Sequence, residues 1–237
     1  MQDAFPKTDV PDEFVRLKYP LPHFAKALLG EAPIRIVAMG SSSTAGREDV
    51  VPYPHRLEMY LRTHYGAEQF PNLRIDVLNR GRGGEEAGDE LLRFERDIFA
   101  ERPSLVIWQV GTNAVFHGDN IDQAAADIAT GLQQLSGKPM DVILIDPQYT
   151  PAMLFDGKAE TSERIVSLIS AAADEAKVNL FRRWALMRHW HVHNNVGFDQ
   201  LFDPTDSNDK LHQSDWSTLL VAKAMRDAII RAPPAQG

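Results

Sequence analysis

The chain has 237 residues, and its 25 Lys and Arg against 33 Asp and Glu give a formal net charge of −8 with His neutral. With 43% hydrophobic and 24% charged residues it has the composition of a globular protein, which excludes a disordered, collagen-like or coiled-coil chain. The acidic balance argues against a nucleic-acid or anionic-membrane partner, because phosphate binding depends on clustered Lys and Arg. Cysteine is absent, which excludes disulfides, thiolate metal sites and a cysteine nucleophile.

The apolar runs of the chain are short. Runs such as 105–108 and 142–145 are far below the roughly 20 residues that span a bilayer, so we expect no transmembrane helix. Residues 1–14 carry Asp, Lys, Pro and Glu where a secretory signal would have an apolar run. We therefore expect either a cytoplasmic protein, or a periplasmic or secreted mature chain whose signal has been removed.

Residues 1–30 are rich in Pro and have no clear periodicity, which predicts an extended N-terminal arm packed on a single domain at 31–237. From residue 34 onward, short apolar runs alternate with helical patterns. The runs predict buried strands at 34–39, 73–78, 105–110, 142–145 and 178–181, and the patterns predict helices at 53–65, 86–101, 120–136, 159–177 and 215–231. This alternation predicts a three-layer α/β/α sandwich around a mostly parallel five-stranded sheet.

Four short segments of this predicted fold combine Gly with polar residues. Three of them follow predicted strands, at 40–46 (GSSSTAG), 79–85 (NRGRGGE) and 111–114 (GTNA), and the fourth, at 209–212 (DKLH), precedes the last helix. Ligands bind beyond the carboxyl ends of the strands in such a sheet, so these segments are expected to share one crevice. Together they contain the hydroxyl, base, acid and oxyanion donors that cleavage by a serine requires.

Each of these groups has a candidate. Ser42, on a Gly-flanked turn, is the candidate nucleophile, and His212 would act first as general base and then as general acid. Asp209, three residues before His212, can reach its imidazole and fix its tautomer. The backbone N–H of Gly84 and the side-chain amide of Asn113 are candidate donors to an oxyanion.

In order and position, these four segments resemble the sequence blocks of the SGNH hydrolases, also called GDSL esterases and lipases, over about 34–231. The resemblance implies a flavodoxin-like fold and Ser42 as the nucleophile. It implies an oxyanion hole made by Gly84, Asn113 and the Ser42 N–H, and a triad completed by Asp209 and His212. It also implies hydrolysis of small to medium acyl esters, including O-acetyl groups on carbohydrate, without a metal or organic cofactor.

Two positions depart from the family pattern. Ser41 stands where the first block has Asp in Gly-Asp-Ser, and Ala114 stands where the third block often has an acid after Asn. Neither position belongs to the triad, so we expect activity to survive both. Alignment of Gly40 and Thr44 with the first block selects Ser42 from the run of three serines.

Three further residues are candidate substrate contacts. Gln148 and Tyr149 follow the fourth predicted strand, and their side chains are expected to line the same crevice. His117 follows Asn113 closely and is a similar candidate. For all three, the alternative is an ordinary position in a loop.

Other functions remain open from the sequence alone. An O-acyltransferase would use the same triad with a sugar hydroxyl in place of water, and a catalytically silent domain would bind an acylated glycan through the same fold. A metal-dependent hydrolase would use His189, His191 and His193, which point one way if their segment is extended; a packed loop or helix end is the alternative. The spacing of 81–84 argues against dinucleotide binding, and Thr44 interrupts the Gly-x-Ser-x-Gly pattern of α/β-hydrolases.

Overall fold

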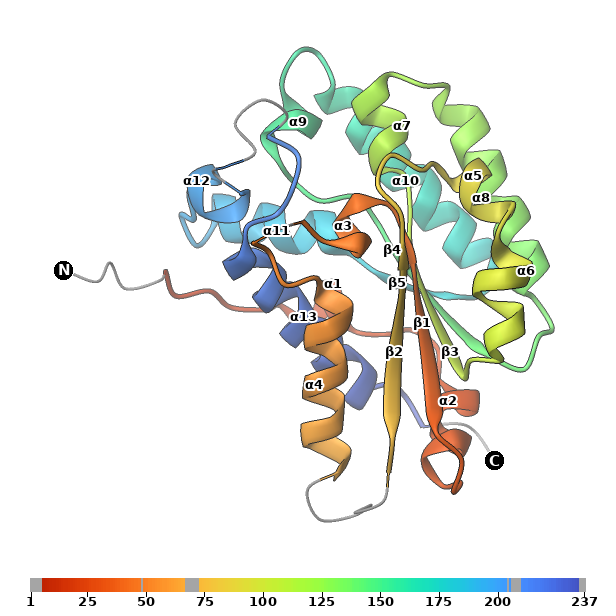
Figure 1. Cartoon of the computed structure of the whole chain (residues 1–237). Coiled ribbons are helices and arrows are strands. Elements are labelled where there is room, and N and C mark those ends of the chain that lie inside the picture. Colours follow the sequence, from red (N-terminus) through yellow and green to blue (C-terminus); the bar gives the residue numbers. More distant parts are fainter. Residues whose placement is uncertain (1–5, 48, 67–72, 204, 206–209, 235–237) are drawn as a thin grey trace.

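A computed structural model of the chain describes residues 6–47, 49–66, 73–203, 205 and 210–234 (Figure 1). Its centre is a five-stranded, all-parallel sheet with strand order β2-β1-β3-β4-β5. The strands are β1 (Ile34–Gly40), β2 (Ile75–Gly81), β3 (Leu105–Gln109), β4 (Asp141–Ile145) and β5 (Asn179–Phe181). All five predicted strands and the flavodoxin-like α/β sandwich are thereby confirmed.

The sheet separates two hydrophobic cores. Ile36 and Ala38 of β1 belong to one core, whereas Val37 and Met39 between and after them belong to the other. Successive side chains of a strand point to opposite faces, so a strand covered on both faces is apolar at every position. This is why most of the strands are nearly continuous apolar runs in the sequence, whereas the edge strand β2 carries Asp76, Asn79 and Arg80.

Helices cover both faces of the sheet (Figure 1). One core is covered by α1 (Asp12–Val15), α2 (Pro22–Leu28), α4 (Tyr53–Gly66), α11 (Arg183–Val192) and α13 (Asp215–Ile230). The other is covered by α5 (Ala87–Leu91), α6 (Phe94–Asp97), α7 (Thr112–His117), α8 (Ile121–Leu135) and α10 (Ala159–Ala176). The remaining elements are single turns: α3 (Ser42–Ala45), the 3₁₀ turn η1 (Phe99–Glu101), α9 (Pro151–Leu154) and α12 (Phe198–Leu201). In the part of the chain that the structure describes, no helix is both long and apolar enough to cross a membrane.

The single helix predicted at 86–101 is wrong, because the segment forms α5, α6 and η1 in succession. Arg93 lies between α5 and α6 and is only 6% exposed. Its guanidinium donates to the backbone carbonyl of Arg80 and to the carboxylate of Asp97, both at 2.7 Å. These bonds offset the helical hydrogen bonds that are lost at the break.

The N-terminal segment also differs from the expected extended arm. α1 and α2 lie within it, and α2 begins with Pro22 at its first position, where the fixed φ of Pro suits a helix. Val15, Leu17 and Phe24 are buried in the same core as α4 and α13. The segment is packed against the sheet, as expected, but in short helical turns.

Candidate active site

Ser42 is the first residue of α3, immediately beyond the carboxyl end of β1. The chain turns sharply here, and Gly40 makes the turn possible. A Cβ at Gly40 would lie 2.5 Å from Oγ1 of Thr44 and 2.8 Å from Oε1 of Gln109, distances that no side chain tolerates. The turn places Ser42 at the edge of the sheet where the predicted crevice was expected.

The side chain of Gln109, at the end of β3, fixes this turn from inside the protein. Its Oε1 accepts hydrogen bonds from the hydroxyls of Ser41, Ser43 and Thr44 at 3.1, 2.9 and 3.3 Å. Gln109 is 1% exposed. The hydroxyls on either side of Ser42 are thus bound to the interior, which distinguishes Ser42 from its neighbours.

The hydroxyl of Ser42 instead meets His212. The two residues are 170 positions apart in the sequence, yet Oγ of Ser42 lies 2.8 Å from Nε2 of His212. This is hydrogen-bond distance, the contact that proton transfer from a serine to a histidine requires. Asp209, the predicted third member, lies outside the described residues.

The other ring nitrogen of His212 faces an arginine. Nδ1 lies 3.0 Å from Nη1 of Arg47. The imidazole of His212 therefore lies between the hydroxyl of Ser42 and the guanidinium of Arg47.

The loop that contains Gly84, one of the two predicted oxyanion donors, approaches Ser42, and the other, Asn113, contacts the same loop. Gly84 has φ +81°, in the left-handed region that favours glycine, and a Cβ at Gly83 would lie 3.9 Å from Cβ of Ser42. The side-chain amide of Asn113 donates to the backbone carbonyl of Glu85 at 2.9 Å. The loop that contains Gly84 is therefore held between Ser42 and Asn113. The amide of Asn113 has two N–H groups, and only one of them donates to Glu85.

A buried ion pair anchors the same loop. Nε of Arg93 donates to Oε2 of Glu85 at 2.6 Å, and Nη1 donates to Asp97 at 2.7 Å. Hydrogen bonds from Arg96 and then from Arg93 hold the pKa of the Asp97 carboxyl well below its usual range. Arg93 was not singled out by the sequence, and its burial has no local signal.

The three candidate substrate contacts lie in different surroundings. Gln148 is 1% exposed. Its Oε1 accepts hydrogen bonds from Thr112 and Arg183, and its Nε2 donates to the Leu211 carbonyl. Its side chain therefore faces the protein interior and is not exposed to the crevice. The ring of Tyr149 is half-buried and makes an edge contact with the ring of Trp184 at a centroid distance of 4.9 Å. His117 is the exposed member of the three, at the end of α7.

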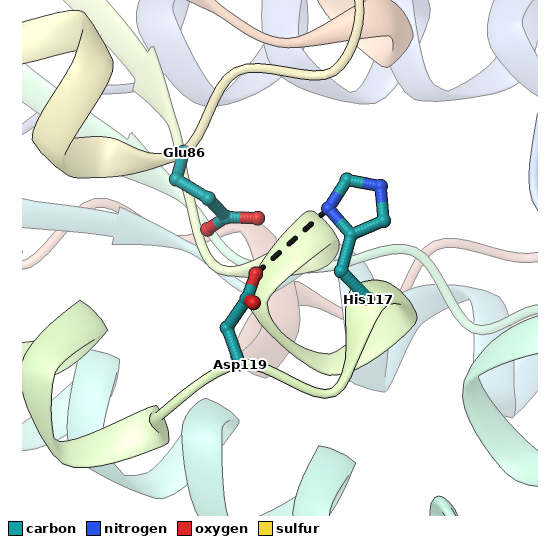
Figure 2. Close-up of side chains that lie close together, drawn as sticks. All are labelled: Glu86, His117 and Asp119. Atoms are coloured by element: carbon teal, nitrogen blue, oxygen red, sulfur yellow. Dashed lines mark ion pairs between the residues drawn. The ribbon is translucent and has the colours of Figure 1, made fainter.

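His117 belongs to a cluster of metal-ligating groups. Figure 2 shows Glu86, His117 and Asp119 turned toward one another, with ligand atoms that all lie within 4.8 Å. Nδ1 of His117 is 3.8 Å from a carboxylate oxygen of Asp119, and both side chains are about half exposed. Burial, together with the carboxylates of Asp119 and Asp89, raises the pKa of Glu86 to about 8. Across the described ranges this is the only group of three such residues found that close together.

The histidines at 189, 191 and 193 do not lie on an extended segment. His189 and His191 lie on α11, and two residues along a helix turn the side chain by about 200°, so they point to opposite sides. Nε2 of His189 meets the carboxylate of Asp9, and Nδ1 of His191 meets the Val196 carbonyl, both at 2.8 Å. The metal-binding arrangement considered from the sequence is therefore wrong for this segment, which forms a helix.

A small pocket opens beside the Ser42–His212 pair. It has a volume of about 20 Å³ and is lined in part by Val50, Pro52 and Thr218. A larger groove of about 580 Å³ lies between α10 and α11, away from Ser42, and includes His189. The small pocket is the one that touches the reactive groups.

Comparisons with known proteins agree with this fold. The model of the non-GDSL lipase-like family matches residues 7–233. Acetylxylan esterase Axe2 from Geobacillus stearothermophilus has a similar structure, with a TM-score of 0.67 and 19% identity over 83% of this chain and 94% of that one. A lipase/acylhydrolase from Enterococcus faecalis has a TM-score of 0.67 and 22% identity over 86% of this chain and all of that one. At these identities the two structures establish the fold.

A curated relative matches a shorter stretch. The uncharacterized lipoprotein YqeF of Bacillus subtilis is 33% identical over 79 residues, so the match spans about a third of that relative's length. The family match covers nearly the whole chain, and Ser41 in place of the Asp of Gly-Asp-Ser agrees with the family's description as non-GDSL. The chain belongs to the non-GDSL lipase-like family, within the SGNH hydrolase superfamily.

Proposed function

We propose that the protein is a serine esterase that hydrolyses short acyl esters through an acyl-enzyme on Ser42. The observation that carries this proposal is the 2.8 Å contact between Oγ of Ser42 and Nε2 of His212. It lies beside the loop of Gly84, which Asn113 holds by its side chain. A nucleophile, a base and two oxyanion donors at one edge of the sheet are the groups that acyl transfer requires.

In the first step, Oγ of Ser42 attacks the ester carbonyl carbon while Nε2 of His212 takes the hydroxyl proton. The carbonyl oxygen becomes an oxyanion that accepts hydrogen bonds from the backbone N–H groups of Ser42 and Gly84 and from the Asn113 amide. When the tetrahedral intermediate collapses, the bond to the alcohol oxygen breaks and His212 returns the proton to that oxygen. The alcohol leaves, and the acyl group remains on Ser42.

In the second step, water repeats the attack. His212 takes a proton from water, the water oxygen bonds to the acyl carbon, and the bond to Oγ of Ser42 breaks as the proton returns to Oγ. The products are a carboxylic acid and the free enzyme. No other reactant is consumed.

For this cycle Nδ1 of His212 has to carry a proton, since Nε2 is then the basic nitrogen. A carboxylate that accepts a hydrogen bond from Nδ1 holds the ring in that tautomer. We assign this carboxylate to Asp209. Structures of Axe2 variants described as catalytic mutants replace a Ser, an Asp and a His, with the Asp three positions before the His, which is the spacing of Asp209 and His212.

The choice of a short acyl group rests on the similar structures of known esterases. The similar structure of Axe2, an acetylxylan esterase, supports an O-acetylated saccharide as the natural substrate. We therefore place O-acetyl groups on carbohydrate first among the substrates.

The test is hydrolysis of p-nitrophenyl acetate, butyrate and octanoate by the wild type, Ser42→Ala and the matched control Ser43→Ala, with a chelator present throughout. We expect acetate to be the best substrate, and Ser42→Ala alone to lose about a thousandfold or more in kcat. Equal rates in the wild type and Ser42→Ala would refute the serine mechanism. An added saccharide that becomes acylated in preference to water would identify an acyltransferase instead, and absence of turnover together with glycan binding would identify a binding domain.

A further inference from the structure

The two residues that flank His212 are held by one pair of buried side chains. Nε2 of Gln148 donates to the backbone carbonyl of Leu211 at 3.3 Å, and Nη1 of Arg183 donates to Oε1 of Gln213 at 3.3 Å. Gln148 and Arg183 are joined in turn, because Nη2 of Arg183 donates to Oε1 of Gln148 at 2.8 Å. The pair therefore binds the backbone of the residue before His212 and the side chain of the residue after it.

The same network reaches the turn that carries Ser42. Oε1 of Gln148 accepts a hydrogen bond from the hydroxyl of Thr112 at 3.0 Å, and that hydroxyl accepts one from Nε2 of Gln109 at 3.3 Å. Oε1 of Gln109 binds the backbone N–H of Ser41 at 3.1 Å. A continuous chain of buried hydrogen bonds thus connects the segment of the candidate base to the segment of the candidate nucleophile.

Burial of Arg183 at this position costs folding free energy. Arg183 is 1% exposed, its hydrogen-bond acceptors are uncharged, and the nearby carboxylate of Asp146 interacts with it electrostatically. Its acceptors are the Asp146 carbonyl at 3.0 Å and the amide oxygens of Gln148 and Gln213. Burial lowers its pKa to about 10 and raises the pKa of neighbouring Asp146 to about 7. A buried cation held mainly by uncharged acceptors costs stability that an apolar side chain of similar volume would not cost.

We propose that Arg183 and Gln148 are positioning residues for the reaction, which hold Leu211 and Gln213 so that His212 stays within bonding distance of Ser42. This inference rests on the proposed function, since it assigns the pair a role in the step between Ser42 and His212. Neither side chain touches the reacting atoms in this arrangement. Their effect on catalysis is through the placement of the imidazole, and a displacement of about 1 Å can cost about a hundredfold in rate.

The test uses Arg183→Lys and Gln148→Met in the full chain. Lys keeps the positive charge but cannot bond to Gln148, Gln213 and Asp146 at once, and Met keeps the volume of Gln148 without its donor and acceptor. We expect kcat for p-nitrophenyl acetate to fall by about a hundredfold in each variant, with KM within about threefold of the wild type. The rate of inactivation by an organophosphonate, which reports the reactivity of Ser42 directly, is expected to fall by a similar factor.

Asn179→Ala is the matched control. Asn179 is also a buried polar residue with two hydrogen bonds, to the N–H and carbonyl of Tyr19, but it lies at the amino end of β5. We expect it to lower the urea midpoint without changing kcat. If Arg183→Lys does not fold, Gln148→Met decides, because it removes the bond to Leu211 while Asp146 and Gln213 still accept from Arg183.

Two results would overturn the inference. One is kcat within threefold of the wild type in both variants while Ser42→Ala is inactive, which refutes the positioning role and leaves the proposed function intact. The other is a fall in kcat for Asn179→Ala as large as that of Arg183→Lys and Gln148→Met, at the same loss of stability. General destabilisation would then explain the effect. Full activity of Ser42→Ala would instead refute the proposed function itself.

Discussion

The side-chain amide of Asn113 and the backbone carbonyl of Glu85 lie 2.9 Å apart, although 28 positions separate them in the sequence. This hydrogen bond joins the first turn of α7 to the loop that follows Gly84. The two proposed oxyanion donors are therefore mechanically linked, and a change at Asn113 affects both.

Asn113→Ala removes one donor and loosens the loop that carries the other. We expect kcat for p-nitrophenyl acetate to fall by about 10²–10³, the range for a lost oxyanion donor. Asn120→Ala is the control, because Asn120 caps α8 and its loss lowers stability by about 1 kcal/mol without touching the site. A similar loss of kcat in both variants would contradict a role of Asn113 in the oxyanion hole.

Gly81→Ala tests the packing of β2 against α3. A Cβ at Gly81 would lie 2.2 Å from the backbone N of Ala45, so the turn that carries Ser42 has to move. We expect a loss of about 1–3 kcal/mol in the free energy of unfolding, the usual cost of overpacking, together with a fall in kcat. Gly66→Ala is the control, since a Cβ there meets nothing within 4 Å. Unchanged urea unfolding and kcat in Gly81→Ala would contradict the close approach.

Arg47→Ala tests the contact at Nδ1 of His212. A positive charge beside the ring disfavours the imidazolium that forms when His212 takes the serine proton, so we expect kcat/KM at pH 7 to rise by a factor of about three when the guanidinium is removed. Arg47→Lys keeps a donor near Nδ1 and is expected to behave as the wild type. A tenfold fall in kcat/KM of Arg47→Ala would show that Arg47 assists the reaction.

The raised pKa of Glu86 predicts how the stability of the protein depends on pH. The pKa of Glu86 is raised to about 8 in the folded protein from an ordinary value of 4.5, because of burial and the carboxylates of Asp119 and Asp89. Folding then favours the protonated form, so stability falls as pH rises from about 4.5 to about 8 and is constant, for this group, on either side. Glu86→Gln removes this dependence and is expected to raise the melting temperature relative to the wild type at pH 9 but not at pH 4. The same difference between the two proteins at both pH values would contradict the shifted pKa.

The strands and the candidate nucleophile were predictable because their signals are local. The run at 105–110, for example, is apolar for almost its whole length, since β3 is buried on both faces. Ser42, Gly84 and Asn113 each follow such a run, which is where ligands bind in a parallel sheet.

The residues that support the site were not predictable in this way. Gln109 is the one case with a local signal, a polar side chain inside an apolar run. Arg93, Gln148 and Arg183 gain their roles from partners 4 to 63 positions away, several of them on other elements, so their burial depends on the complete fold. α11 was missed because its Arg, His and Trp residues give no clear apolar face in the sequence, although Trp184 and Trp190 are buried in the structure.

The most direct test of the account is to identify the residue that an organophosphonate modifies. The wild type is incubated with a p-nitrophenyl phosphonate, its esterase activity is followed, and the modified peptide is sequenced by mass spectrometry. The account predicts one adduct per chain, on Ser42, with loss of activity in step with labelling and no adduct in Ser42→Ala. An adduct on Ser43 or another residue that accompanies the loss of activity, or full activity after Ser42 is labelled, would contradict it.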